Sequence, residues 1–80
     1  MALAADRRRL NNLLSKIKTK NLQEWLSEAS KIPELASALE GIYCGRMGKI
    51  NEELSCGRLY ITMGWYSIDG PARVEYAYVS

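Results

Sequence analysis

The chain has 80 residues, of which 48% are hydrophobic and 25% are charged, and its formal net charge is +2 at pH 7. These values are ordinary for one small folded domain, and they exclude wholesale disorder, a fibrous repeat and a two-domain enzyme. The chain contains no histidine, so a His-dependent catalytic triad and a mixed Cys/His zinc site are also excluded. Five tyrosines and two tryptophans without any phenylalanine form a less usual aromatic composition.

The charge is unevenly distributed along the chain. Residues 1–20 carry six cations and one carboxylate, a net charge of +5, whereas residues 21–40 carry four glutamates and one lysine, a net charge of −3. Such asymmetry indicates contact with an acidic partner, or a basic element that lies against an acidic element of the same domain.

A first amphipathic helix is predicted over residues 4–18. Four apolar residues recur there at the helical spacing and form one stripe: Leu10, Leu13, Leu14 and Ile17. Six cations flank this stripe or point away from it: Arg7, Arg8, Arg9, Lys16, Lys18 and Lys20. Two interpretations of these cations stay open. They could bind nucleic-acid phosphates or an acidic protein surface, or they could form a solvated face that is partly paired with Glu24 and Glu28 of the next helix.

Two further helices are predicted next. Asn21 can cap a helix that ends near Ser30 or Lys31, with Glu24 completing a capping-box pattern. Pro33 fits the first turn of a third helix, and its apolar spacing continues to Ile42 and Tyr43.

One more short helix is predicted near the middle of the chain. Ile50 and Leu54 flank two glutamates at helical spacing, and Cys56 with Gly57 then marks a break. We therefore expect the helical part of the domain to span residues 4–55.

The spacing of apolar residues changes to a period of two after Gly57. Residues 58–66 and 73–79 are rich in aromatic and β-branched residues and flank Asp69-Gly70, which predicts a β-hairpin over 58–79. Centring the turn on Asp69 and Gly70 pairs Trp65 with Val74, Met63 with Tyr76 and Ile61 with Tyr78 on a core face. The opposite face would then hold Tyr60, Thr62, Gly64, Tyr66, Arg73, Glu75, Ala77 and Val79.

The sequence thus predicts a single α+β domain over residues 1–80, with three to four helices followed by a C-terminal antiparallel hairpin. A lone hairpin is marginal in water, so its core face must pack on the helices or on another chain. The hairpin has two sheet edges, and pairing of an edge across a two-fold axis predicts a homodimer.

No catalytic, cofactor or metal site is predicted. Cys44 and Cys56 are too few for the disulfide framework of a small secreted domain and match no metal-site spacing, so we expect free buried thiols. The amino-terminal segment has no apolar run of signal-peptide length, and no stretch reaches the roughly 18 apolar residues of a membrane span. We therefore expect a cytoplasmic protein without membrane contact.

The predicted function is non-enzymatic protein–protein contact, as in an adaptor, a regulator or an inhibitor of a larger partner. Four residues of the outer hairpin face would form the binding surface: Tyr60, Thr62, Tyr66 and Arg73.

The alternative function is a small DNA-binding regulator, either winged-helix-like or acting through the basic first helix. Helices followed by a hairpin have the element order of a winged helix. However, the helix that would enter the DNA groove carries Glu34 and Glu40 and no cation.

Overall fold

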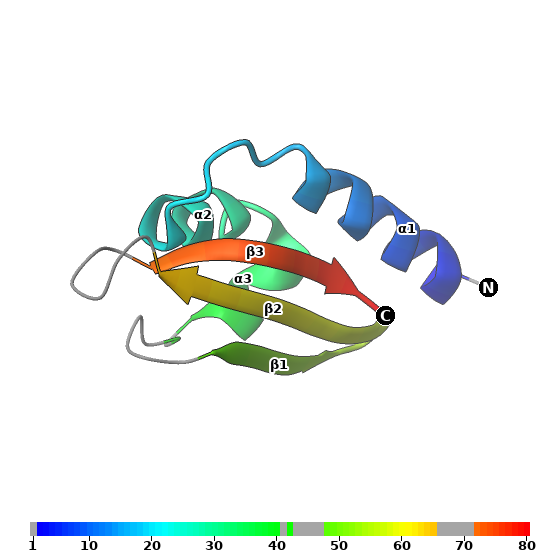
Figure 1. Ribbon diagram of the computed structural model, residues 1–80. Coiled ribbons are helices and arrows are strands. Elements are labelled where there is room, and N and C mark those ends of the chain that lie inside the picture. Colours follow the sequence, from blue (N-terminus) through cyan, green and yellow to red (C-terminus); the bar gives the residue numbers. More distant parts are fainter. Residues whose placement is uncertain (1, 41, 43–47, 66–71) are drawn as a thin grey trace.

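The computed structural model describes residues 2–40, 42, 48–65 and 72–80. These residues form three helices followed by three strands, which confirms the predicted α+β class (Figure 1). The elements are α1 (Ala2–Ser15), α2 (Leu22–Ala29), α3 (Pro33–Leu39), β1 (Lys49–Leu54), β2 (Gly57–Trp65) and β3 (Ala72–Val79).

The three strands form one antiparallel sheet in the order β1-β2-β3. The hairpin of β2 and β3 was predicted, but the short helix expected around Ile50 and Leu54 is wrong, because these residues belong to β1. Ile50 is buried opposite Ile61 of β2, and the residues on either side of it are exposed. A spacing of four residues places two side chains on one face of a strand as well as of a helix, so this pair could not distinguish the two.

The register of the β2–β3 hairpin differs from the prediction. Tyr60 pairs with Tyr78, and Thr62 pairs with Tyr76, before an irregularity at Thr62/Met63 after which Met63 pairs with Val74. A one-residue slip moves a strand's side chains to the opposite face of the sheet. Tyr76 and Tyr78, predicted in the core, are therefore 70% and 47% exposed.

The same shift turns two predicted outer residues of β3 inward. Val79 is buried, and Ala77 is half-buried and packs against the core. The predicted turn at Asp69 and Gly70 and the side chain of Trp65 lie outside the described part of the structure.

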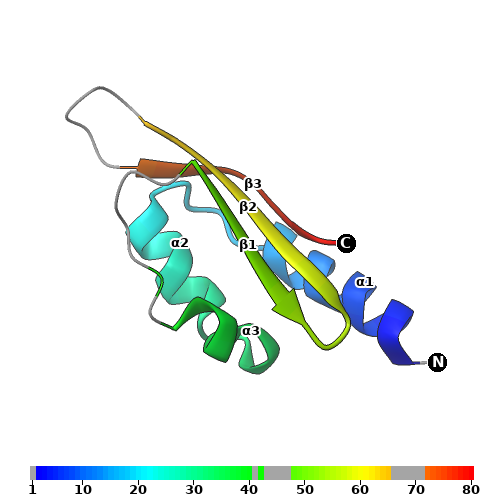
Figure 2. The ribbon, with the colours of Figure 1, turned by 90° about the horizontal axis from the view of Figure 1, so that it is seen from below.

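α2 and α3 lie on one side of the sheet, and α1 runs along its β3 edge (Figures 1 and 2). α1 and α2 pack against β3, and α3 packs against β1. A single apolar core fills the space between the helices and the inner face of the sheet. Its buried members are Leu10, Leu14, Leu22, Trp25, Ala29, Leu35, Leu39, Ile50, Cys56, Leu59, Ile61, Met63, Val74 and Val79.

The helix boundaries follow from local hydrogen bonding. Asn21 caps α2 as predicted, because its side-chain oxygen accepts a hydrogen bond from the Glu24 N–H at 3.1 Å. The Glu24 carboxylate accepts from the Thr19 hydroxyl, at 2.8 Å, instead of closing the capping box. Pro33 begins α3 as predicted, and the helix ends at Leu39, since Glu40 is extended with ψ of 131°.

The first helix also ends earlier than predicted, at Ser15 instead of residue 18. The chain then leads to β3, where the Lys20 carbonyl accepts a hydrogen bond from the Val74 N–H at 2.7 Å. Further along β3, the Asn11 side chain bonds the Val79 backbone twice, accepting from its N–H at 2.8 Å and donating to its carbonyl at 2.9 Å. The segment after α1 and the Asn11 amide therefore bond the outer edge of β3 near both of its ends.

Candidate functional site

The face of the sheet opposite the helices is uncovered in the described part of the chain (Figures 1 and 2). Side chains alternate between the two faces along each strand, so every burial of an apolar residue toward the helices turns its neighbours outward. Burial of Leu59, Ile61 and Met63 leaves the intervening residues of β2 on this open face. The open face is formed by Lys49, Asn51 and Glu53 of β1, Arg58, Tyr60, Thr62 and Gly64 of β2, and Arg73, Glu75, Tyr76 and Tyr78 of β3.

Tyrosine rings dominate the centre of the open face. Tyr60 and Tyr78 pair directly across β2 and β3, and their rings stack with centroids 5.1 Å apart and planes inclined by 19°. Stacking of this kind contributes about 0.5–1.5 kcal/mol beyond area burial. Tyr76 lies two residues from Tyr78 on the same face and is the most exposed large hydrophobic residue described. The face therefore presents a preformed aromatic surface to solvent.

A shallow hollow of about 270 Å³ adjoins the stacked pair. Tyr60 and Tyr78 form one wall, and Lys49, Asn51 and Thr62 supply polar groups around it. An aromatic wall with a few polar groups is typical of a recognition surface, because the rings supply contact area and the polar groups fix orientation.

The far end of the open face carries opposite charges close together. The Arg73 guanidinium lies 3.5 Å from the Glu75 carboxylate, and both side chains are about two-fifths exposed. Gly64 of β2 leaves room for this pair, since a Cβ there would lie 2.5 Å from the Glu75 carboxylate oxygen. In total, the open face holds three cations and two carboxylates, so its net charge is small.

Three of the four residues predicted to bind a partner lie together on the open face. Tyr60, Thr62 and Arg73 do lie on the open face, and Arg73 is engaged by Glu75. Tyr66 lies outside the described residues. Sequence reasoning missed Tyr76 and Tyr78, because a hairpin register counted from the expected turn carries no sign of the irregularity beside Met63.

The six cations predicted to contact nucleic acid or an acidic partner do not form one surface. Arg9 forms an ion pair with Glu34 of α3. Half-buried Arg7 places its aliphatic stem beside Gly57, at the start of β2, while Arg8 is exposed. The predicted pairing with Glu24 and Glu28 is wrong in this structure, since Glu24 accepts from Thr19 and Glu28 pairs with Lys31.

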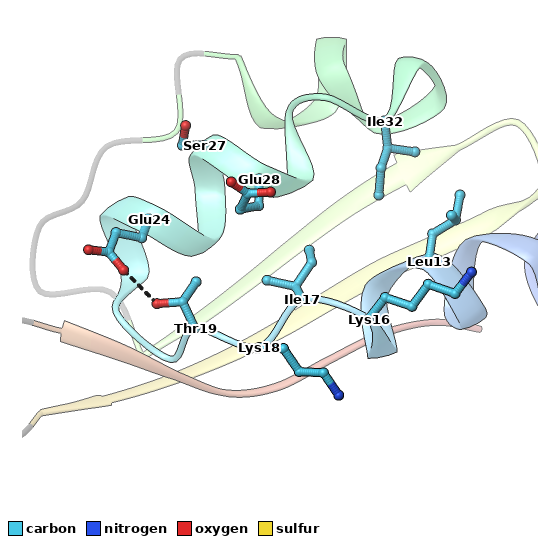
Figure 3. A pocket seen from close by; sticks show the side chains of 9 residues that line it. All are labelled: Leu13, Lys16, Ile17, Lys18, Thr19, Glu24, Ser27, Glu28 and Ile32. Atoms are coloured by element: carbon cyan, nitrogen blue, oxygen red, sulfur yellow. Dashed lines mark hydrogen bonds between the residues drawn. The ribbon is translucent and has the colours of Figure 1, made fainter.

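The remaining three cations lie after α1. Lys16 and Lys18 border a groove of about 580 Å³ between the end of α1 and α2 (Figure 3). The groove has an apolar lining formed by Leu13, Ile17 and Ile32. Its α2 side is lined by Glu24 and Glu28. Lys20 is exposed beside β3. The cations are thus dispersed over the described part of the chain.

A metal site and the state of one of the two cysteines can be checked in the described part of the chain. Within residues 2–40, 42, 48–65 and 72–80, no three His, Cys, Asp or Glu side chains gather closely enough to hold a metal ion. Cys56 is a buried free thiol, as predicted, and Cys44 lies outside the described residues. None of the helices described here has the length and apolarity needed to cross a membrane.

Comparisons of the chain with models of protein families, with curated proteins and with solved structures give no match in any of the three.

Proposed function

We propose that this chain is a non-enzymatic binding module that contacts another protein through the open face of its sheet. The observation that carries the proposal is the exposure of Tyr76 and Tyr78 beside the stacked Tyr60 on a face without a helix. Tyrosine is enriched at the centres of protein interfaces, where its ring buries much area at little cost in side-chain entropy.

The charges of the described residues favour a protein partner over DNA or RNA. Binding to a phosphate backbone needs several cations that act together. On the open face, carboxylates accompany the cations. α3 carries Glu34 and no cation, and Glu40 follows it directly. Arg9 of α1 is already paired with Glu34. A DNA-binding regulator is therefore the second candidate, and it would depend on α1 rather than on α3.

The proposal is tested by affinity capture from the cells that produce the protein, with quantitative mass spectrometry. Three baits are compared: the wild type, Tyr76→Ser/Tyr78→Ser on the open face, and Arg8→Ala/Lys16→Ala on the helical side as the matched control. We expect a protein that the wild type and the control capture and that the tyrosine variant loses. With that partner purified, each tyrosine substitution should weaken binding about 30-fold or more, the effect of losing a hot-spot side chain.

The same proteins should also be titrated into fluorescent duplex and single-stranded oligonucleotides. If binding to an oligonucleotide falls steeply with salt and disappears in the Arg8→Ala/Lys16→Ala variant, the DNA-binding alternative replaces the proposal. A capture profile that is identical for all three baits would also contradict it.

A further inference from the structure

The two edges of the sheet differ in how their backbone groups are satisfied. At the edge of β3, the Asn11 side chain bonds the Val79 backbone and the Lys20 carbonyl accepts from the Val74 N–H. Along β1, on the opposite edge, no hydrogen bond reaches the outer side of the strand among the residues that the structure describes. An unpaired strand edge is a template for another strand, because its N–H and C=O groups lack partners.

The register between β1 and β2 identifies which groups of β1 point outward. The Met63 N–H donates to the Gly48 carbonyl at 3.1 Å, so position 48 directs its backbone groups toward β2. Directions alternate along an antiparallel strand, and Lys49, Asn51 and Glu53 therefore direct theirs to the free edge. The side chains of the same three residues are exposed on the open face.

These three residues are complementary to a second copy of themselves. A two-fold antiparallel pairing must place an outward-directed residue opposite another outward-directed residue. Centring the pairing on Asn51 places Lys49 opposite Glu53 of the second copy, and it does so twice. Centring it on Lys49 or on Glu53 places like charges opposite each other and shortens the overlap. Centring it on Ile50 places Lys49 opposite Asn51, without an opposite charge.

We propose that β1 pairs with β1 of a second copy around a two-fold axis at Asn51, so that two three-stranded sheets become one continuous sheet. The axis is perpendicular to the sheet, and the open faces of both copies then lie on the same side. In each copy, the hollow beside the stacked tyrosines would then lie next to the contact between the two β1 strands. Its lining includes Lys49, Asn51, Tyr60 and Tyr78. The predicted homodimer is thus assigned to β1, a strand that the sequence did not predict. The assignment rests on the free edge and is independent of what the tyrosines bind.

Charge reversal with rescue tests the proposal by sedimentation at micromolar concentrations. The wild type should sediment at twice the 9.0 kDa mass of one chain. Lys49→Glu should weaken the dimer about tenfold or more, because two attractive cross-strand pairs become repulsive. Lys49→Glu/Glu53→Lys should restore the dimer, since the swap recreates both pairs. All substituted side chains are exposed, and circular dichroism of each variant confirms its fold.

Cysteine cross-linking tests the register in a background with Cys44→Ser and Cys56→Ala. Asn51→Cys should form a disulfide with its own copy, because residues that exchange hydrogen bonds have Cα atoms about 5.5 Å apart, within disulfide range. Lys49→Cys alone should not cross-link, whereas a mixture of Lys49→Cys and Glu53→Cys chains should. A wild type of 9.0 kDa at every concentration, a double swap that stays monomeric, or equal cross-linking at all positions would overturn the proposal.

Discussion

The double hydrogen bond between Asn11 and Val79 joins the first helix to the last strand, 68 residues away in sequence. The Asn11 side-chain amide forms the pair of hydrogen bonds that a neighbouring strand would form, because it accepts from the Val79 N–H and donates to the Val79 carbonyl. Replacing Asn11 by Ala removes both bonds and leaves two partly buried backbone groups without a protein partner. A net hydrogen bond contributes about 0.5–1.5 kcal/mol, so the loss should be about 1–3 kcal/mol.

The neighbouring Asn12 supplies a matched control, because it lies in the same helix, is exposed and has no side-chain hydrogen bond in the structure. Asn→Ala raises helix propensity equally at both positions, so the difference between the two variants isolates the contact with Val79. In thermal unfolding followed by circular dichroism, Asn11→Ala should melt at least about 4–8 °C below Asn12→Ala. Asn11→Asp, which keeps the acceptor and loses the donor, should fall between them. Equal melting temperatures for Asn11→Ala and Asn12→Ala would refute the role assigned to this amide.

Two further predictions concern backbone positions. Gly57→Ala should lower the free energy of unfolding by about 1–3 kcal/mol in urea titrations, because its Cβ would lie 2.5 Å from the Ser80 carbonyl oxygen. Gly48→Ala is the control, since a Cβ there meets no atom within 4 Å; a similar loss for both would contradict the steric explanation. Asn21→Ala should lower the free energy of unfolding by about 1 kcal/mol, because it removes the cap of α2. Asn21→Ser should retain most of this free energy, because serine can also cap a helix. An unchanged unfolding midpoint for Asn21→Ala would show that the cap adds nothing.

The sequence predicted those features that depend on neighbouring residues. The cap at Asn21, the start of α3 at Pro33 and the change to a period of two after Gly57 each follow from local chemistry, and each is present. The predicted end of α1 was wrong because of a contact with a residue far away in the sequence. The apolar stripe of α1 extends to Ile17. However, the Val74 N–H donates a hydrogen bond to the Lys20 carbonyl, and the chain after α1 is extended so that Lys20 reaches β3. The pairing of Lys20 with β3 therefore decides where α1 ends, rather than the helical spacing of its apolar residues.

The open face was harder to predict than the fold. A strand at β1 could not be distinguished from a helix by two apolar residues four positions apart. The free edge that we assign to dimer formation was therefore not visible in the sequence. Tyr60 and Thr62 were placed correctly, because β2 alternates regularly from Leu59 to Met63. Tyr76 and Tyr78 were misplaced, because β3 does not alternate regularly.

The irregularity in β3 allows Val74 and Val79 to be buried while Tyr76 and Tyr78 are exposed. Val74 and Val79 are both buried although an odd number of positions separates them, which a regular strand does not allow. The extra residue is Glu75, since Met63 pairs with Val74 and Thr62 pairs with Tyr76. Without this bulge, burial of Val79 would turn Glu75 toward the core and Val74 outward, and an unpaired buried carboxylate is very costly. Burial of Val79 directs Tyr76 and Tyr78 to the open face, and the bulge then returns Val74 to the core while Glu75 stays exposed beside Arg73.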